Sequence, residues 1–321
     1  MRELKNLVTV TGKLVKNNLK ESVVTSGNES ADAISGSLVL RTADNSEHEI
    51  NFFSWRYKKD ENKHFTSEES YFYKAYRDAM YNLKDIEHCA EGESPDVISI
   101  TDGRFDANDF KAGDGSIVST NRISARFINK VEPKDYENTV LEAKFEVEGV
   151  IEKISDELRN DIPTGNLIVN IDAIAQRSEG FGKDANHNAD SLVPIRLVVD
   201  KTIAEGFRNA GYFEGCFAKL TGVLINTVEV EEIVEKAAFG PDIKKKIKTT
   251  IRKKEVKSGV APSTIYENDL TDDIMAVLKS KRKAKLDEIK NGTSKASLSA
   301  EGFKKDTSTP APQTNYNPFA Q

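Results

Sequence analysis

The chain has 321 residues, of which 38% are hydrophobic and 31% charged, and its formal net charge is −6. This length allows about two domains of roughly 150 residues each, and the acidic balance means that a polyanion would need a local group of cations. The sequence contains no run of about 20 apolar residues, so we expect no membrane span. Its two cysteines, Cys89 and Cys216, form neither a disulfide framework nor a metal motif, so we expect a cytoplasmic protein.

The first predicted domain, residues 1–135, opens with three strands. Their sequences are "NLVTVTGKLVKN", "ISGSLVLRT" and "HEINFFSWRYKK", and a loop over residues 17–33 is expected between the first two. Thr66 and Glu69 then form a capping-box pattern, which predicts a helix that starts at Thr66 and continues to Leu83. Two further strands, "PDVISITDGRF" and "NRISARFINKVE", are expected to be joined by a loop over Gly103–Ser116.

The second predicted domain, residues 136–262, repeats this order. Three strand patterns are followed by a short helix with a second capping box, Thr202 and Glu205, and by two more strands. Each copy carries a glycine in its first and fourth strands, where a barrel strand bends or bulges. Five strands with a helix between strands three and four are typical of an OB-fold barrel. The sequence therefore predicts a mainly β protein with two tandem OB-fold-like barrels, and the alternative is two unrelated α+β modules.

Two C-terminal segments follow the predicted barrels. Residues 263–292 are expected to contain a helix that begins at Thr271 and ends at Gly292. Residues 293–321 are rich in Ser, Thr and Pro and poor in apolar residues, a composition that predicts a disordered tail.

No motif supports catalysis. The sequence lacks GxxxxGK[ST], HExxH and GxSxG, and its four histidines are scattered among polar residues. We therefore expect a protein without enzymatic activity, cofactor or metal. A two-metal nuclease stays open as a rival because carboxylates are plentiful.

The third strand carries aromatic residues on both faces. Ile50 and Phe52 share the parity expected to face the core, whereas the opposite parity starts with polar residues and is expected to face solvent. The residues predicted to bind DNA here are Phe53, Trp55, Arg56, Tyr57 and Lys58. Exposed rings stack on any base, at about 1–3 kcal/mol each. The alternative is that the C-terminal helix or the other barrel covers these rings.

The last strand of each copy is basic. Seven lysines and Arg252 lie between Lys244 and Lys257, with Glu255 as the one anion. A row of cations predicts phosphate contacts, and the alternative is a solvated edge on which lysines prevent aggregation. The residues predicted to contact DNA are Lys246, Lys248, Arg252 and Lys254 in the second copy and Arg122, Arg126 and Lys130 in the first. Loop residues Arg104, Phe105, Phe181 and Lys183 are expected to add to them.

With these features the chain resembles single-stranded DNA-binding proteins, and most of all the tandem OB-fold versions carried by bacteriophages. The resemblance covers about residues 5–260 by architecture. It implies binding of single-stranded DNA without sequence specificity during replication, recombination or repair, in the cytoplasm of a bacterial host. The outer faces of both barrels are expected to form one path for the strand. The rivals are an OB-fold structural or protein-interaction module and a single-stranded RNA-binding protein.

The resemblance also implies a partner site at the end of the tail. Such proteins recruit replication or recombination enzymes through their last residues, which in bacterial members are an acidic run followed by Pro-Phe. Pro318 and Phe319 are similar to that ending, but the acidic run is missing and Ala320 and Gln321 extend beyond it.

Overall fold

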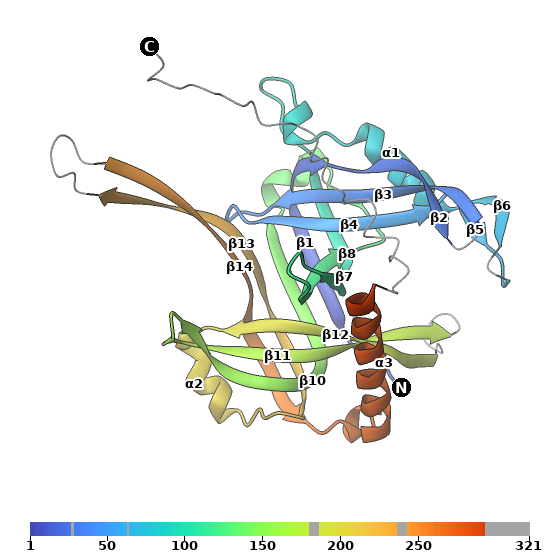
Figure 1. Ribbon diagram of the computed structural model, residues 1–321. Coiled ribbons are helices and arrows are strands. Elements are labelled where there is room, and N and C mark those ends of the chain that lie inside the picture. Colours follow the sequence, from blue (N-terminus) through green and yellow to red (C-terminus); the bar gives the residue numbers. More distant parts are fainter. Residues whose placement is uncertain (27–28, 63, 180–185, 236–242, 293–321) are drawn as a thin grey trace, which may run out of the picture.

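The computed structural model describes residues 1–26, 29–62, 64–179, 186–235 and 243–292. Figure 1 shows two strand-rich units, with a helix along one side and a long two-stranded arm on the other. The prediction of a mainly β protein with a C-terminal helix is confirmed. None of the helices within these ranges has the length and apolar character needed to cross a membrane.

The first barrel is built from five strands whose pairings lead back to the starting strand. β1 pairs with β3 and β7, β3 pairs with β4, β4 lies parallel to β8, and β8 pairs with β7. α1 lies between the third and fourth of these strands in the sequence, as predicted. The bounds are β1 Asn6–Asn17, β3 Glu29–Arg41, β4 Glu47–Trp55, α1 Tyr71–Asn82, β7 Val97–Lys111 and β8 Ile117–Ser124.

The second barrel repeats the same circuit. β10 pairs with β11 and β13, β11 pairs with β12, β12 lies parallel to β14, and β14 pairs with β13. This strand order, with α2 after the third strand, is the predicted OB-fold plan in both copies. The bounds are β10 Glu142–Arg159, β11 Ile162–Glu179, β12 Asn186–Val199, α2 Lys201–Asn209, β13 Phe217–Glu235 and β14 Ile243–Ser263.

The strand glycines stand where two backbones approach closely. A Cβ atom on Gly149 of β10 would lie 2.3 Å from the carbonyl oxygen of Asp172, and one on Gly222 of β13 would lie 2.1 Å from that of Glu255. Any side chain at these positions would push neighbouring strands apart. The repeated glycines are therefore needed for the close packing of the barrel strands.

The two barrels are joined through their first strands. β1 pairs antiparallel with β10 from Asn6↔Val147 to Thr11↔Glu142, so one ladder runs from one barrel into the other. The ring of Phe105 in β7 packs against Phe145 in β10, with ring centroids 6.2 Å apart. The buried residues of both barrels accordingly form one connected hydrophobic cluster.

Three local predictions were wrong, the first two because hydrogen bonds between strands overrode a local signal, and the third because the cap lies two residues earlier than predicted. The predicted loop over residues 17–33 contains β2, Lys20–Ser26, which pairs with the start of β3. α1 begins at Tyr71 rather than Thr66, because Phe65–Glu69 is a strand, β6, paired with β5, Tyr57–Lys59, and the Thr66 hydroxyl donates to the Lys58 carbonyl. The cap of α2 is Asp200, whose carboxylate accepts from the Thr202 amide.

The predicted loop over Gly103–Ser116 is mostly strand. β7 continues to Lys111 and pairs with β8 along its length, so only a short turn separates them. β8 ends at Ser124, which leaves Arg126 beyond the fifth strand. Lys130 lies in a two-residue strand, β9, Asn129–Lys130.

The arm in Figure 1 is the extension of β13 and β14 beyond the second barrel. Near its base it contacts the first barrel, where the amide of Asn226 donates to the Ser46 hydroxyl over 3.1 Å.

The C-terminal helix, α3, Asp272–Asn291, begins and ends as predicted. The Thr271 hydroxyl accepts from the Ile274 amide, and Gly292 has the left-handed conformation with φ of 71°. Met275 and Leu278 pack with Ile174, Leu192 and neighbouring apolar residues of the second barrel.

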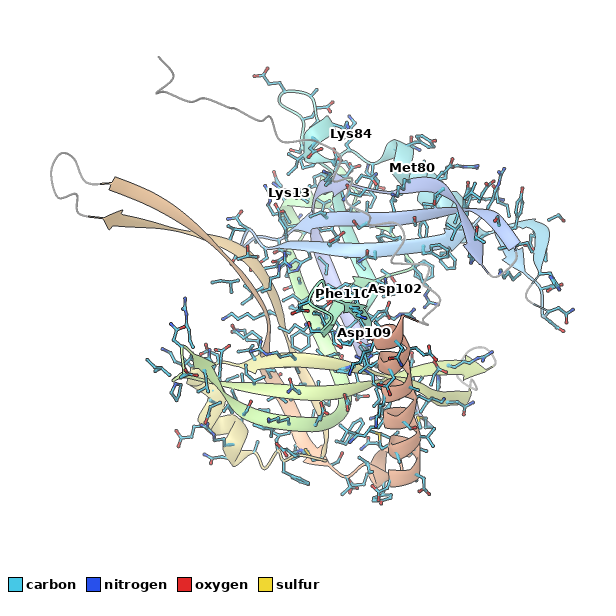
Figure 2. The ribbon with its side chains drawn as sticks, viewed as in Figure 1. Lys13, Met80, Lys84, Asp102, Asp109 and Phe110 are labelled. Carbon is cyan, nitrogen blue, oxygen red and sulfur yellow. The ribbon has the colours of Figure 1, made fainter. Side chains whose placement is uncertain are left out.

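α3 also holds the first barrel. Arg282 binds the carboxylate of Asp109 in β7 with both Nη atoms, each at 2.6 Å, and the Asp109 side chain is fully buried. Figure 2 shows Asp109 and Phe110 beside the helix. Although burial acts in the opposite direction, the hydrogen bonds from Arg282 and Ser119 lower the pKa of Asp109. The carboxylate is therefore charged and paired, and α3 bridges the two barrels.

Candidate nucleic-acid interface

A cleft of about 1270 Å³ lies between the outer face of the first barrel and the edge of the second. Its walls come from β1, β3, β4, β7 and β8 on one side and from the neighbouring ends of β11 and β12 on the other. The cations that line it are Lys5, Lys20, Arg104, Arg122 and Arg126, and the anions are Glu3, Asp102, Asp106 and Asp190. The surplus of cations is small, 5 − 4 = 1, and all three arginines lie on β7, on β8 or just after β8, together with Asp102 and Asp106.

Phe53 lines this cleft from β4. The alternation predicted for this strand is correct, because Ile50 and Phe52 are buried at 0% and 3% exposure, whereas Phe53 is 39% exposed. Its strand neighbour Asn51 also lines the cleft and donates from Nδ2 to the Ile123 carbonyl over 3.1 Å. An aromatic ring is thus held on a hydrogen-bonded sheet and open to a ligand.

A smaller hollow of about 350 Å³ shares Phe53 with the cleft and continues along the strand. It is lined by Trp55, Tyr57, Lys58 and Lys59 among others. The rings of Phe53 and Trp55 meet edge to face, with centroids 5.1 Å apart, and Lys59 lies 5.4 Å from the Trp55 centroid. Lys58 is ion-paired with Glu68. Rings and ammonium groups therefore extend from the cleft to the β5–β6 hairpin.

Arg122 projects from β8 into the cleft with an unsatisfied donor. Its Nε is buried and has no hydrogen-bond partner within the described ranges. A buried donor without an acceptor costs about 1–3 kcal/mol. Arg122 also belongs to the cleft lining, so an anionic ligand there would meet a cationic side chain.

The other two arginines of the cleft are exposed and paired loosely with aspartates. Arg104 Nε lies 3.3 Å from Asp106, and Arg126 Nε lies 3.5 Å from Asp102. Exposed pairs of this kind contribute at most about 1 kcal/mol. A phosphate can therefore replace the aspartates as the partner of these guanidinium groups at little cost.

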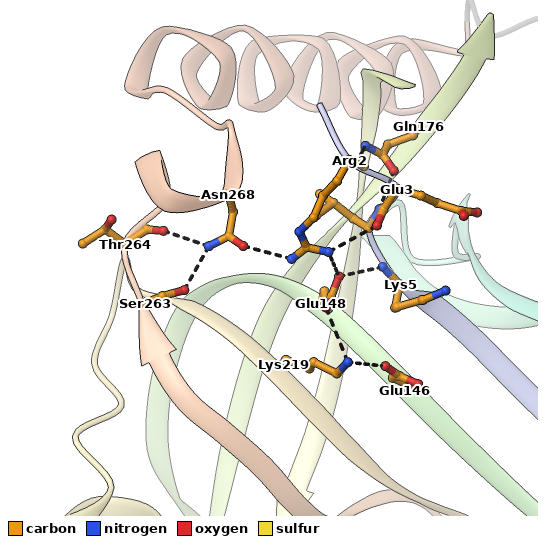
Figure 3. Close-up of polar contacts among 11 residues, drawn as sticks. Arg2, Glu3, Lys5, Glu146, Glu148, Gln176, Lys219, Ser263, Thr264 and Asn268 are labelled. Carbon is orange, nitrogen blue, oxygen red and sulfur yellow. Dashed lines mark hydrogen bonds and ion pairs between the residues drawn. The ribbon is translucent and has the colours of Figure 1, made fainter. Parts of the chain in front are cut away.

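The N-terminal segment forms another wall of the cleft and is anchored on the second barrel (Figure 3). Arg2 binds the buried carboxylate of Glu148 over 2.6 Å and the side-chain oxygen of Asn268 over 2.9 Å. Gln176 completes the anchor, because it donates to the Arg2 carbonyl over 2.8 Å and accepts from the Leu4 amide over 2.7 Å. Residues 3–7 are thereby held in place along the cleft.

Three residues predicted to bind DNA have other surroundings. Phe105 borders the cleft, but it is 1% exposed and packs in the core, because β7 continues through the predicted loop, so its ring cannot stack on a base. Arg56 binds Asp32 over 2.9 Å, and this hydrogen bond raises its pKa. Lys130 binds Asp96 over 2.8 Å and lies outside the cleft lining.

Two predicted cations of the second barrel whose side chains the structure describes, Arg252 and Lys254, do not line the cleft. Arg252 donates from Nε to Asn226 over 3.2 Å at the base of the arm. Lys254 Nζ lies 5.4 Å from the centroid of the Phe105 ring, and burial, helped by the charge of Arg196, lowers its pKa to about 8. The expectation of one path over both barrels is therefore not supported by the placement of these two residues.

The remaining predicted site residues cannot be placed. The side chains of Lys246 and Lys248 lie outside the described part of the chain, and so do Phe181, Lys183, Pro318 and Phe319.

One contribution to the cleft and one to the smaller hollow were missed by sequence reasoning. Residues 3–7 read only as the approach to the first strand, and the contacts of Arg2 and Gln176 that fix them join positions far apart in the sequence. Lys59 carried a signal, because it directly follows the predicted residues in the same aromatic and basic stretch.

Comparison with known proteins gives one family match. Residues 5–292 match the family described as YorF. No curated protein matches the sequence.

Several solved structures resemble the chain at low identity. The wild-type single-stranded DNA-binding protein from Thermus aquaticus has 11% identity and a TM-score of 0.43, covering 82% of this chain and 95% of that one. A deletion mutant of the same protein gives 12% identity and a TM-score of 0.42, covering 82% and 96%. A replication protein A heterotrimer bound to single-stranded DNA gives 14% identity and a TM-score of 0.21, covering 77% and 49%.

Proposed function

We propose that the chain, which belongs to the YorF family, binds single-stranded DNA without reading its sequence. The strand would lie in the cleft, with bases on Phe53 and Trp55 and phosphates near Arg104, Arg122 and Arg126. The observation that carries the proposal is a cleft that exposes the ring of Phe53 and is lined by Arg104, Arg122 and Arg126.

The chemistry of the cleft favours a single strand over a duplex. A flat ring can stack on any base whose face is free, and base faces are free in a single strand but hidden in a duplex. Guanidinium groups bind phosphate oxygens whatever the sequence. The combination of rings and arginines therefore accounts for binding without sequence preference.

The wider role follows the resemblance in the sequence. We propose that the protein coats DNA exposed during replication, recombination or repair, in a bacteriophage that multiplies in the cytoplasm of its host, and that it acts without catalysis. Protein partners would be recruited through Pro318 and Phe319. Removing residues 293–321 should then abolish partner recruitment and leave the affinity for DNA unchanged, which pull-down and titration of the truncated chain would check.

The decisive experiment is a titration with matched single-stranded and duplex DNA at about 50 mM and about 200 mM salt. The fluorescence of Trp55, the one tryptophan of the chain, reports the site directly. We expect single-stranded thymidine oligomers to bind and to change this fluorescence, with affinity that falls as salt rises, and duplex DNA to bind more weakly.

Two results would reject the proposal. Equal affinity for duplex and single strand would remove the stacking role, and a failure to bind any oligonucleotide at low salt would favour a structural or protein-interaction module. A matched RNA oligomer as competitor separates DNA from RNA binding.

A further inference from the structure

A second row of aromatic rings starts where the cleft reaches Arg126. The guanidinium carbon of Arg126 lies 5.7 Å from the centroid of the Phe127 ring. Phe127 contacts Phe72 in α1 at 5.5 Å, and Phe72 contacts Tyr71 at 5.7 Å between centroids. We call Phe127, Phe72 and Tyr71 the α1 row. It is separate from the rings of Phe53 and Trp55, which lie on β4.

The first member of this row is held firmly in position. The amides of Arg126 and Phe127 both donate to the carboxylate of Asp102, over 3.1 and 3.2 Å. The hydroxyl of Tyr76 in α1 donates to the Arg126 carbonyl over 2.9 Å. The segment is thus tied to β7 on one side and to α1 on the other, so a ligand would meet a surface already in place.

Two rings of the α1 row, those of Tyr71 and Phe127, are open to solvent, whereas Phe72 is partly buried against the barrel core. Tyr71 is 67% exposed and Phe127 is 42% exposed, whereas Tyr73 and Tyr76 of the same helix are 3% and 1% exposed. The buried tyrosines account for the packing of α1 on the barrel. Tyr71 and Phe127 contribute less to that packing, so their rings are free to contact a ligand.

We propose that a DNA strand leaving the cleft at Arg126 continues over the α1 row, so that Phe127 and Tyr71 form a second stacking surface. This inference rests on the proposed function. A nucleic acid is favoured over a protein partner because the α1 row is continuous with the cleft through Arg126. This residue lines the cleft, and its guanidinium lies over the Phe127 ring of the row. A cation next to flat rings is also the arrangement found at Lys59 and Trp55.

The test compares thymidine oligomers of two lengths on the full chain. One has about 5 nucleotides and fills the cleft, and the other has about 16 nucleotides and can reach beyond it. Tyr71→Ala and Phe127→Ala should each weaken binding of the long oligomer roughly 5- to 150-fold, the equivalent of one lost stacked base. Binding of the short oligomer should change less than about 2-fold, because neither Tyr71 nor Phe127 belongs to the cleft lining.

Tyr81→Ala is the matched control. Tyr81 belongs to the same helix and is 70% exposed, but it lies in the last turn of α1, ten residues after Tyr71. This variant should bind both oligomers like the wild type. Tyr71→Phe should also bind like the wild type, because the ring is kept.

A fluorescence experiment gives an independent readout. In a chain carrying Trp55→Phe and Tyr71→Trp, the single indole reports the α1 row, and the long oligomer should change its fluorescence while the short one should not. The inference is overturned if Tyr71→Ala and Phe127→Ala bind the long oligomer like the wild type, or if they weaken both lengths equally. Failure of the wild type to bind either length would reject the proposed function itself, which is a distinguishable result.

Discussion

Replacement of Phe53 by alanine gives the sharpest test of the cleft. Phe53 belongs to both hollows, and its ring is 39% exposed while its edge contacts Trp55. One open ring can stack on one base. Stacking on an aromatic side chain contributes about 1–3 kcal/mol per base, so Phe53→Ala should weaken binding of a thymidine oligomer roughly 5- to 150-fold.

The loss should not depend on salt, because stacking releases no counterions. We would measure affinity by fluorescence anisotropy of a labelled oligomer at about 50 mM and about 200 mM salt. The slope of log affinity against log salt should match that of the wild type, while the whole line is displaced to weaker binding. A changed slope would mean that the substitution had moved the arginines rather than removed a ring.

Phe110→Ala is the matched control for this experiment. Phe110 is also a phenylalanine on a strand of the first barrel, and its exposure of 44% is close to that of Phe53, but it lies outside the cleft lining. It should bind DNA like the wild type. We expect Phe53→Ala to lose at least about 5-fold in DNA affinity. An affinity within about 2-fold of the Phe110→Ala control would refute the stacking role of Phe53.

Three further predictions concern charge. Arg122→Met should weaken DNA binding and reduce the magnitude of the salt slope by about 0.7, which corresponds to one phosphate contact. The free energy of unfolding should not fall, since the substitution removes a buried donor that lacks an acceptor. An unchanged salt slope would contradict the phosphate contact. Arg282→Met should lower the free energy of unfolding by roughly 3–5 kcal/mol, because it leaves the buried carboxylate of Asp109 without its partner. A second change, Asp109→Leu, should restore most of this free energy in urea titrations. A loss below about 1 kcal/mol in Arg282→Met would mean that the pair is dispensable. Burial, with Glu152 nearby, raises the pKa of Asp172 to about 6 from 3.8, so its ionised form destabilises the fold by up to about 3 kcal/mol above pH 6. Asp172→Asn should therefore stabilise the protein at pH 7, and the gain should shrink as the pH falls from 6 towards 4; a gain independent of pH would contradict this cause.

The repeated strand plan was readable from the sequence because its signals are local or periodic. Alternation placed Phe52 inside and Phe53 outside, and the spaced glycines marked the close approaches at Gly149 and Gly222. The same local signals failed where strands outcompeted them. The capping pattern at Thr66 was overridden by the β5–β6 pairing, since a hydrogen-bonded hairpin offered that hydroxyl another partner.

The cleft could not be derived from sequence for a related reason. It depends on how the second barrel and α3 lie against the first, and these positions are set by pairs such as Arg282 with Asp109 and Arg2 with Glu148. Such pairs are separated by more than a hundred residues and have no periodic signature. The basic strand of the second copy was predicted to join the site on its composition, but composition does not say which way a strand leads after it leaves its barrel.

The ladder between β1 and β10 has a consequence for how the molecule comes apart. An ordinary two-domain chain can be cut at its linker into halves that each remain native. Here the cut would separate β1 from β10, and the backbone groups of residues 6–11 and 142–147 would lose the hydrogen bonds of this ladder. Separately expressed halves would each expose an unpaired edge strand and would tend to aggregate or to pair with each other again. The chain should thus melt as a single cooperative unit, with heat and denaturant each producing one transition.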